Sequence, residues 1–221
     1  MPMRRIFDDE LQTMHGQFTK MGLMVNENIL RAVKSFINHD KELAVDAKKK
    51  DKAINAIEVE IENFCFQLIA LQQPVTSDLR SIVTVMKASS DLERMGDHAV
   101  SIARSVIRAK EDRVKRIPEV EAMIGEMSEI VQTMVQDGID AYVRRDTEEA
   151  YRVAEMDTQV DEHFEAINRF ALESMAADSE VVPGGADYIS VAGYLERIGD
   201  YVTNICERII YLETGEILEL N

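Results

Sequence analysis

The sequence predicts an all-α fold, built as two tandem antiparallel three-helix bundles of six long helices in total. Three observations predict it: apolar residues recur at helical spacing, few turn-forming residues interrupt them, and one six-residue motif occurs twice. The 221 residues include only 10 glycines and 4 prolines, too few for a β fold with many turns. The chain is long enough to bury a substantial core.

Three helices are expected in the first half. The first runs from about residue 8 to 37, and Asp40 can cap the second. The second carries a seam of apolar residues three and four apart and ends near residue 73, before Pro74. The third starts after Thr76 or Ser77, either of which is a good N-cap, and reaches about residue 115.

The second half repeats this order. Its first helix ends near residue 145, and Asp146 with Glu149 resembles a capping box that opens the next. That helix fades near 177–179, and the Pro-Gly-Gly run at 183–185 separates it from the last, which ends near residue 213. Helices of this length extend about 45 Å.

An internal duplication relates the halves. Leu-Glu-Arg-Met-Gly-Asp at 92–97 recurs as Leu-Glu-Arg-Ile-Gly-Asp at 195–200, and Asp146 follows Asp40 by 106 positions. The change of spacing falls in a connection between helices, where a change of length costs little. Two landmarks in the same order predict two copies of a three-helix unit, at 1–116 and 117–221.

Composition excludes several classes of protein. The chain has 25 basic and 41 acidic residues, a net charge of −16, which disfavours binding to nucleic acid. No apolar run follows the N-terminal arginines, and the most apolar run, 64–71, is too short to span a bilayer. The two cysteines are far apart and form no disulfide or zinc motif. We therefore expect a cytoplasmic protein with no direct membrane insertion.

Pairs of carboxylates mark the duplicated motif. Glu93 and Asp97, and likewise Glu196 and Asp200, are four residues apart, so each pair lies on one helix face. That face borders the apolar stripe instead of lying opposite to it, where a merely solvated pair would be expected. Their position singles out these four residues among the many acidic ones.

A second polar stripe precedes each motif. Asp51 and Asn55 lie on the second helix, and Asp157 and Asp161 lie at the equivalent positions, 106 residues later. If the second and third helices of each half pack side by side, each stripe faces the motif of its own half.

Facing carboxylates repel unless something neutralises them, and the residue pattern leaves two solutions open. One is a salt-bridge network that uses Arg94, Arg197, Arg80 or Arg104. The other is a cation, since clustered oxygen ligands suit hard or borderline ions such as Mg²⁺, Ca²⁺, Mn²⁺ or iron. The candidate metal ligands are Glu93, Asp97, Glu196, Asp200, Asp157, Asp161, Asp51 and Asn55.

Other features suggest structural roles. Gly96 and Gly199 predict close helix–helix packing, and His98 points away from its neighbour Asp97 as a surface histidine would. The Lys-Lys-Lys run at 48–50 is typical of a solvated helix face, and the 12 methionines are expected in the core.

Motifs for catalysis are missing from the sequence. It has no HExxH or ExxH, which argues against a zinc protease and against the usual di-iron carboxylate bundle. It has no GxGxxG, GxxxxGK[ST] or GxSxG, so nothing suggests nucleotide binding or a hydrolase nucleophile. We expect a protein that is not an enzyme.

The duplicated motif, together with Gln-Pro-Val-Thr-Ser-Asp-Leu-Arg at 73–80, resembles the PhoU family over essentially the whole chain. The resemblance implies a cytoplasmic bacterial protein that represses the phosphate-starvation response. Its implied partners are the ATPase subunit of a phosphate ABC transporter, the sensor histidine kinase of a two-component system, and a second copy in a homodimer.

The resemblance also bears on the acidic residues. Some family members hold multinuclear iron or zinc on E(D)xxxD motifs; Glu93, Asp97, Glu196 and Asp200 map onto that motif, with the second stripe as further ligands. Mn²⁺ or Mg²⁺ suits the same donors. This sequence departs from the duplicated pattern at Asn55, where the second half has an aspartate. The first site is therefore expected to bind metal more weakly than the second.

The leading hypothesis is a negative regulator of phosphate uptake that acts as a signalling adaptor. A second hypothesis is a metal-carboxylate helical-bundle enzyme or metal store, which the duplicated acids favour and the missing ExxH disfavours. A third is a purely structural interaction module in which the acids are surface charge.

Overall fold

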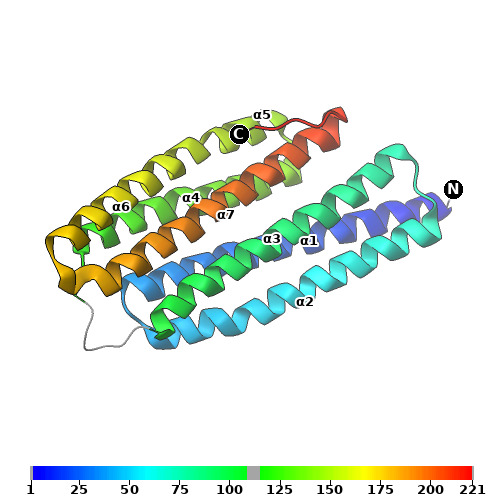
Figure 1. Cartoon of the computed structure of the whole chain (residues 1–221). Helices are drawn as coiled ribbons and strands as arrows, with labels where there is room; N and C mark the ends of the chain where they lie inside the picture. Colours follow the sequence, from blue (N-terminus) through cyan, green and yellow to red (C-terminus); the bar gives the residue numbers. More distant parts are fainter. Residues whose placement is uncertain (1, 109–114, 221) are drawn as a thin grey trace.

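A computed structural model describes residues 2–108 and 115–220 of the chain (Figure 1), and it confirms the all-α prediction. No β-strand occurs within those two ranges. The helices are α1 (Pro2–Ile37), α2 (Lys41–Gln72), α3 (Thr76–Arg108), α4 (Pro118–Arg144), α5 (Thr147–Glu155), α6 (Asp157–Ala177) and α7 (Val182–Thr214), with a short 3₁₀ turn (Ser179–Val181) before α7.

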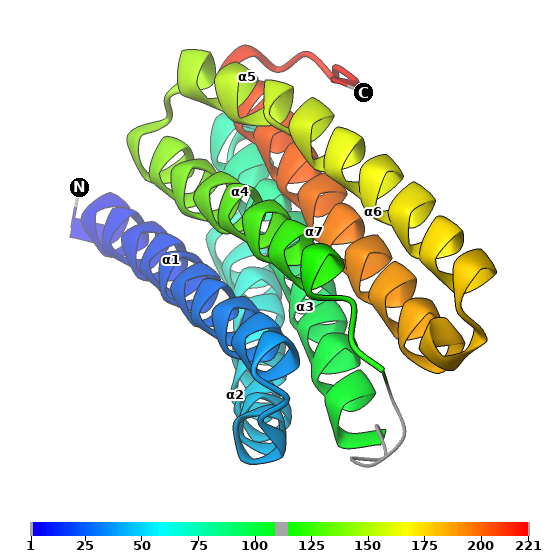
Figure 2. The same ribbon diagram turned by 90° about the vertical axis from the view of Figure 1, so that its left-hand side faces the viewer.

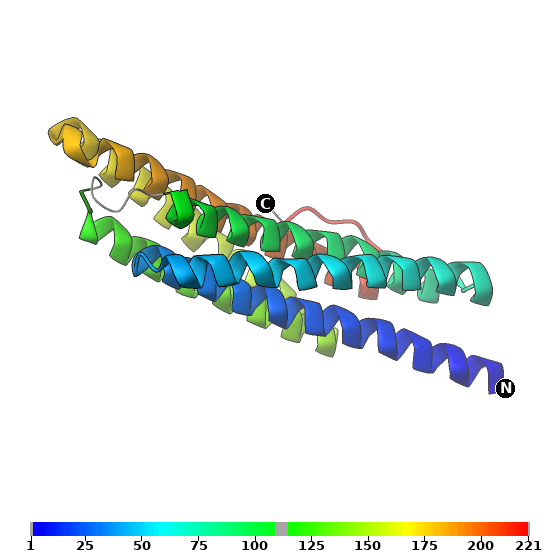
Figure 3. The same ribbon diagram turned by 90° about the horizontal axis from the view of Figure 1, so that it is seen from below.

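Two three-helix bundles lie side by side, as the duplication predicts. α1, α2 and α3 form the first; α4, the broken helix α5–α6 and α7 form the second. α3 packs against α7 and α1 against α4, so one continuous core spans both bundles (Figure 2). All the long helices run close to one common direction (Figure 3). None of the described helices is long and apolar enough to cross a membrane.

Two of the predicted helix caps, Asp40 and Asp146, are confirmed. The backbone N–H of Leu43 donates to Asp40 Oδ1 at 2.9 Å, and that of Glu149 donates to Asp146 Oδ1 at 3.0 Å. Each cap satisfies one of the N–H groups that a helix start leaves unpaired. Thr76 and Ser77 lie instead inside the first turn of α3, which therefore begins slightly earlier than expected. The expected end of this helix falls on 109–114, outside the described residues.

Two expectations in the second half are wrong. The fifth predicted helix is broken at Met156, between α5 and α6. The run at 183–185 does not separate helices but lies in the first turns of α7; the break is upstream, where Asp178 is extended. Proline is tolerated in a first helical turn because its missing N–H would be unpaired there anyway. A Cβ on Gly185 would lie 2.5 Å from Met175 Sδ, so glycine lets α7 approach α6 closely.

Polar contacts cross the junction between the bundles. Arg208 Nε on α7 donates to Asp91 Oδ2 on α3 at 2.8 Å. His15 on α1 hydrogen-bonds through Nδ1 to the hydroxyl of Tyr142 on α4, and through Nε2 to Ser81 Oγ on α3 at 3.1 Å. The two bonds of His15 tie α1, α3 and α4 together at one partly buried point.

His15 is expected to make stability depend on pH. Burial, and then the charge of Arg145, lower the pKa of His15 from 6.5 to about 4, so the folded protein holds it neutral. Neutral His15 makes its full contribution to the free energy of unfolding above pH 6.5. That contribution is lost as pH falls towards 4, because the unfolded chain binds the proton first. We expect the stability advantage of the wild type over His15→Gln to shrink by about 2 kcal/mol between pH 7.5 and 4.5, allowing for partial solvent screening. Denaturant unfolding of both proteins at the two pH values measures it, and a constant difference would contradict the assignment.

Candidate functional site

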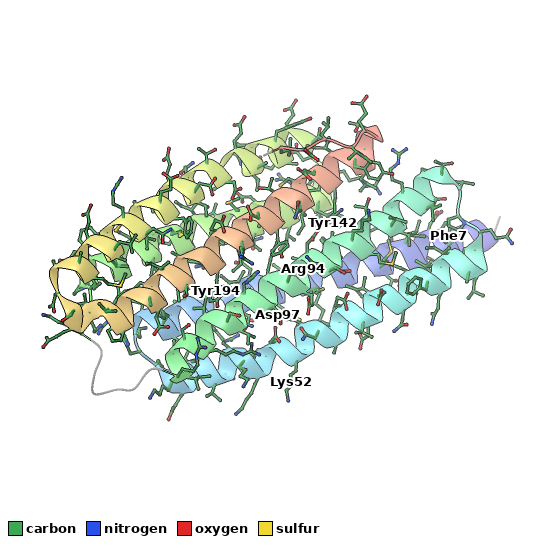
Figure 4. All side chains as sticks on the ribbon, viewed as in Figure 1. Phe7, Lys52, Arg94, Asp97, Tyr142 and Tyr194 are labelled. Atoms are coloured by element: carbon green, nitrogen blue, oxygen red, sulfur yellow. The ribbon has the colours of Figure 1, made fainter. Side chains whose placement is uncertain are left out.

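The predicted metal-ligating residues gather in two acidic clusters, one in each bundle. The first lies where α2 runs beside α3, and the second where α6 runs beside α7. Figure 4 shows Asp97 on the side of α3 that is next to α2. The first cluster consists of Asp51, Asn55, Glu93 and Asp97, and the second of Asp157, Asp161, Glu196 and Asp200. The structure thus places each stripe beside the motif of its own half.

Each cluster has a buried base and an exposed rim. Asp51 and Asp157 are the bases, with exposed fractions of 8% and 3%. Both lie against the glycine of the duplicated motif: a Cβ on Gly96 would lie 3.1 Å from Asp51 Oδ1, and one on Gly199 would lie 2.5 Å from Asp157 Oδ1. The predicted close packing at these glycines is confirmed, and the group they approach is the carboxylate itself.

The motif glycines are expected to tolerate substitution unequally. In a helix interior, alanine is intrinsically favoured over glycine by about 1 kcal/mol. At Gly96 the nearest oxygen is close to contact distance, so Gly96→Ala should be nearly neutral. At Gly199 the new methyl must displace a buried carboxylate, so Gly199→Ala should be less stable than Gly96→Ala by about 1–2 kcal/mol. Denaturant unfolding of the two variants checks the order, and equal stabilities would contradict it.

The carboxylates of the first cluster repel one another. Burial, and then the charge of Asp97, raise the pKa of Asp51, while Arg104 and Asn55 oppose the shift. Burial, and then Asp97, also raise the pKa of Glu93. The carboxylates therefore lie close enough to disfavour each other's ionisation.

The second cluster behaves in the same way. Burial raises the pKa of Glu196, and the charges of Asp200 and Asp161 add to the shift. Burial, and then Asp161, raise the pKa of Asp200, which Arg197 opposes. The same physics in both halves follows from the duplication, because equivalent residues occupy equivalent helix faces.

Arginine does not neutralise these carboxylates directly. Within the described ranges, no lysine or arginine nitrogen lies within 4 Å of the carboxylates of Glu93, Asp97, Glu196 or Asp200. Arg94 instead lies over the ring of Tyr201, 5.9 Å from its centroid. A direct salt bridge to these four carboxylates is thus not observed in the described ranges, although the charges of Arg94 and Arg197 oppose the raised pKa values of Glu93 and Asp200.

The carboxylate and amide oxygens of the clusters are of the type that binds a hard cation, but they do not converge on one point. Asp51 Oδ1 and Asn55 Oδ1 are buried and have no hydrogen-bond partner among the described residues, as an unused ligand atom would. Yet among the described residues no three His, Cys, Asp or Glu side chains come close enough together to hold one ion. The rim residues Asp97, Asp161 and Asp200 are exposed to solvent.

Aromatic side chains meet where α3 packs against α7, near the labelled Arg94 and Tyr194 (Figure 4). His98 is half-buried and stacks between Tyr194 and Tyr201, with ring centroids 5.7 and 5.8 Å away. The expectation of a surface histidine is therefore wrong: its partners come from the other repeat, which helical spacing within α3 does not show.

The fold and the clusters together define a class of protein: a duplicated helical bundle that carries one acidic cluster in each repeat. The chain belongs to the PhoU family. The family model, described as the PhoU domain, matches twice, at residues 18–106 and 124–209.

Relatives and solved structures cover nearly the whole chain. It is 38% identical over 219 residues, 99% of this chain and 100% of the relative, to the phosphate-specific transport system accessory protein PhoU homolog of Streptococcus pneumoniae. It is 34% identical over 210 residues, 95% of this chain and 86% of the relative, to phosphate-specific transport system accessory protein PhoU of Escherichia coli.

Two crystal structures share the fold. That of the phosphate transport system regulatory protein PhoU from Streptococcus pneumoniae has a TM-score of 0.88 at 36% identity and covers 96% of this chain and 99% of that one. That of PhoU from Pseudomonas aeruginosa has a TM-score of 0.90 at 34% identity and covers 95% and 100%. The chain is thus a member of a family of phosphate transport accessory proteins.

Proposed function

We propose that the chain is a negative regulator of phosphate uptake and of the phosphate-starvation response, and that it works without catalytic turnover. The observation that carries the proposal is the full-length similarity to proteins described as phosphate transport accessory and regulatory proteins. In the proposal it is a cytoplasmic homodimer that links the ATPase subunit of a phosphate transporter to a sensor histidine kinase. An adaptor needs surfaces and not a nucleophile, which agrees with the lack of catalytic motifs.

We further propose that the acidic clusters bind multivalent cations, iron or zinc in a multinuclear site, with Mn²⁺ or Mg²⁺ as weaker occupants. Support comes from the oxygen donors, the mutual repulsion of the carboxylates and the unpartnered oxygens of Asp51 and Asn55. Inward rotation of the rim carboxylates would complete the ligand set. The second cluster should bind more tightly, because it has Asp161 where the first has Asn55.

Deletion of the gene tests the regulatory role. A phosphate-starvation reporter, measured in high phosphate, should become active in the deletion strain and be repressed again by the wild-type gene on a plasmid. Unchanged repression in the deletion strain would overturn the proposal.

A further inference from the structure

After the end of α7, residues 215–220 turn back along that helix (Figure 1), and Ile217 and Leu218 line a cavity between α7 and α3. Gly215 ends α7 in the left-handed conformation (φ 78°), and its N–H donates to Tyr211 O at 2.9 Å. Further along, the N–H of Leu220 donates to Glu207 Oε1 at 2.9 Å. We refer to residues 215–220 as the C-terminal segment.

The surface under this segment carries both signs of charge: Arg80, Lys87 and Arg208 are basic, whereas Glu207 is acidic and Arg208 is paired with Asp91. Arg80 on α3 lies over the ring of Tyr211, 5.4 Å from its centroid, and a Cβ on Gly215 would lie 2.8 Å from its Nη1. Lys87 on α3 and Arg208 on α7 line a cavity of about 160 Å³ beneath the segment. We call this surface the α3–α7 groove.

The C-terminal segment carries charge opposite to that of Arg80 and Lys87, and it fills the cavity only in part. Its sequence, Gly-Glu-Ile-Leu-Glu-Leu, alternates acidic and aliphatic residues. Leu218 and Leu220 pack against the core, whereas Ile217, at the edge of the cavity, is 85% exposed. The hydroxyl of Thr84, in the cavity wall, is buried and has no hydrogen-bond partner among the described residues. The cavity has room for several water molecules, so a larger occupant would fit.

We propose that the α3–α7 groove is a docking site for a partner protein segment in which acidic and aliphatic residues alternate, and that the C-terminal segment is its intramolecular competitor. The partner's carboxylates would meet Arg80 and Lys87, an aliphatic side chain would fill the cavity, and a backbone N–H would replace that of Leu220 on Glu207. Arg208 is already paired with Asp91 and is not needed for this. The proposal does not depend on cation binding at the acidic clusters.

The competition has a quantitative consequence. A tethered segment acts at an effective concentration of the order of millimolar, so it suppresses binding of a free segment of equal intrinsic affinity. Weakening the tethered segment should therefore strengthen binding from outside. The groove joins α3 of one repeat to α7 of the other, so a docked partner would contact both bundles at once.

The test uses the full-length chain and a fluorescein-labelled Gly-Glu-Ile-Leu-Glu-Leu peptide, followed by fluorescence anisotropy. The Leu218→Ser, Leu220→Ser variant should bind the peptide at least tenfold more tightly than the wild type. Adding Lys87→Glu to it should remove most of that gain. A control peptide with lysine in place of both glutamates should not bind.

A second released variant, Glu216→Lys with Glu219→Lys, keeps the leucine contacts and should show the same gain, so a folding defect in the first variant does not decide the result. Equal peptide affinity of the wild type and both released variants, or no binding to any of them, would overturn the proposal. The proposal would also be overturned if the wild type sediments as a dimer and both released variants do not. The C-terminal segment of a second copy would then occupy the groove.

Discussion

Mn²⁺ or Fe²⁺ added to the purified chain is expected to raise its melting temperature, and the Asp161→Asn, Asp200→Asn double variant should lose most of that rise. The two carboxylates lie in one cluster, where the charge of Asp161 raises the pKa of Asp200. A cation replaces this repulsion with attraction and binds the folded state selectively. At free metal a hundredfold above its dissociation constant, the added stability is about 2.7 kcal/mol. Differential scanning fluorimetry with and without metal measures it.

The metal-free proteins give the matched control. The double variant should be more stable than the wild type without metal, because it removes like charges that repel each other. The equivalent change in the first cluster, Asp51→Asn with Asp97→Asn, should reduce the metal effect less, since Asn55 already lacks a charge. A wild type that ignores added cations, together with a metal-free variant that melts lower, would contradict cation binding.

The metal effect should also weaken as pH falls. The pKa values of Glu196 and Asp200 are raised, so the metal-free folded state takes up protons on these groups before the unfolded chain does. Metal-free stability therefore gains from these two groups as pH falls through their raised pKa values, and protons compete with the cation for the same oxygens. A metal-induced rise in melting temperature that is larger at pH 5 than at pH 7.5 would contradict this.

Glu121→Ala is expected to lower the free energy of unfolding by about 3–5 kcal/mol. The Glu121 carboxylate is buried at the start of α4 and accepts four hydrogen bonds. Arg116 donates two of them, at 3.0 and 2.5 Å; the Tyr188 hydroxyl donates at 2.7 Å and His39 Nε2 contributes the fourth at 3.0 Å. Alanine would leave these donors without their acceptor, where helices of both repeats meet.

Glu121→Gln is the matched control, because it keeps the side-chain shape and one acceptor oxygen. Burial opposes ionisation of Glu121, but the hydrogen bonds from Arg116, Tyr188 and His39 outweigh it and lower the pKa. The ionised carboxylate therefore makes its full contribution to the free energy of unfolding above the usual pKa of glutamate. That contribution is lost as pH falls through the lowered pKa. Urea unfolding at pH 7 should rank wild type, Glu121→Gln and Glu121→Ala in falling order; a loss under 1 kcal/mol for the alanine variant would contradict the role of this carboxylate.

Much of the fold could be predicted because local signals agree with it. Asp40 and Asp146 act as helix caps, and both are expected from residue type and spacing alone. The errors arise where packing overrides local preference. In the sequence Gly185 predicts the end of a helix, but it lies inside α7, where Met175 leaves no room for a side chain. The break at Met156 has no glycine or proline to mark it.

The sequence predicts which residues form the acidic clusters, but it does not predict how deeply each residue is buried. Spacing and duplication place Asp51 beside Glu93, yet only the packing of α2 on Gly96 shows that its carboxylate is buried. The stacking of His98 and the α3–α7 groove were missed, because both depend on contacts between the repeats. A signal for the groove was present in the glycine that follows α7 and the acidic–aliphatic alternation after it.

We infer that the duplicated acidic clusters are needed for the proposed regulatory function, and reporter activity in high phosphate for a charge-neutralised variant measures this directly. Glu93→Gln, Asp97→Asn, Glu196→Gln and Asp200→Asn together keep side-chain size, and all four sites lie at least partly in solvent, so the fold should persist. Expressed at wild-type level in the deletion strain and folded by circular dichroism, this variant is predicted to leave the reporter active. Full repression by the folded variant would contradict the claim and make the acids surface charge on a structural module.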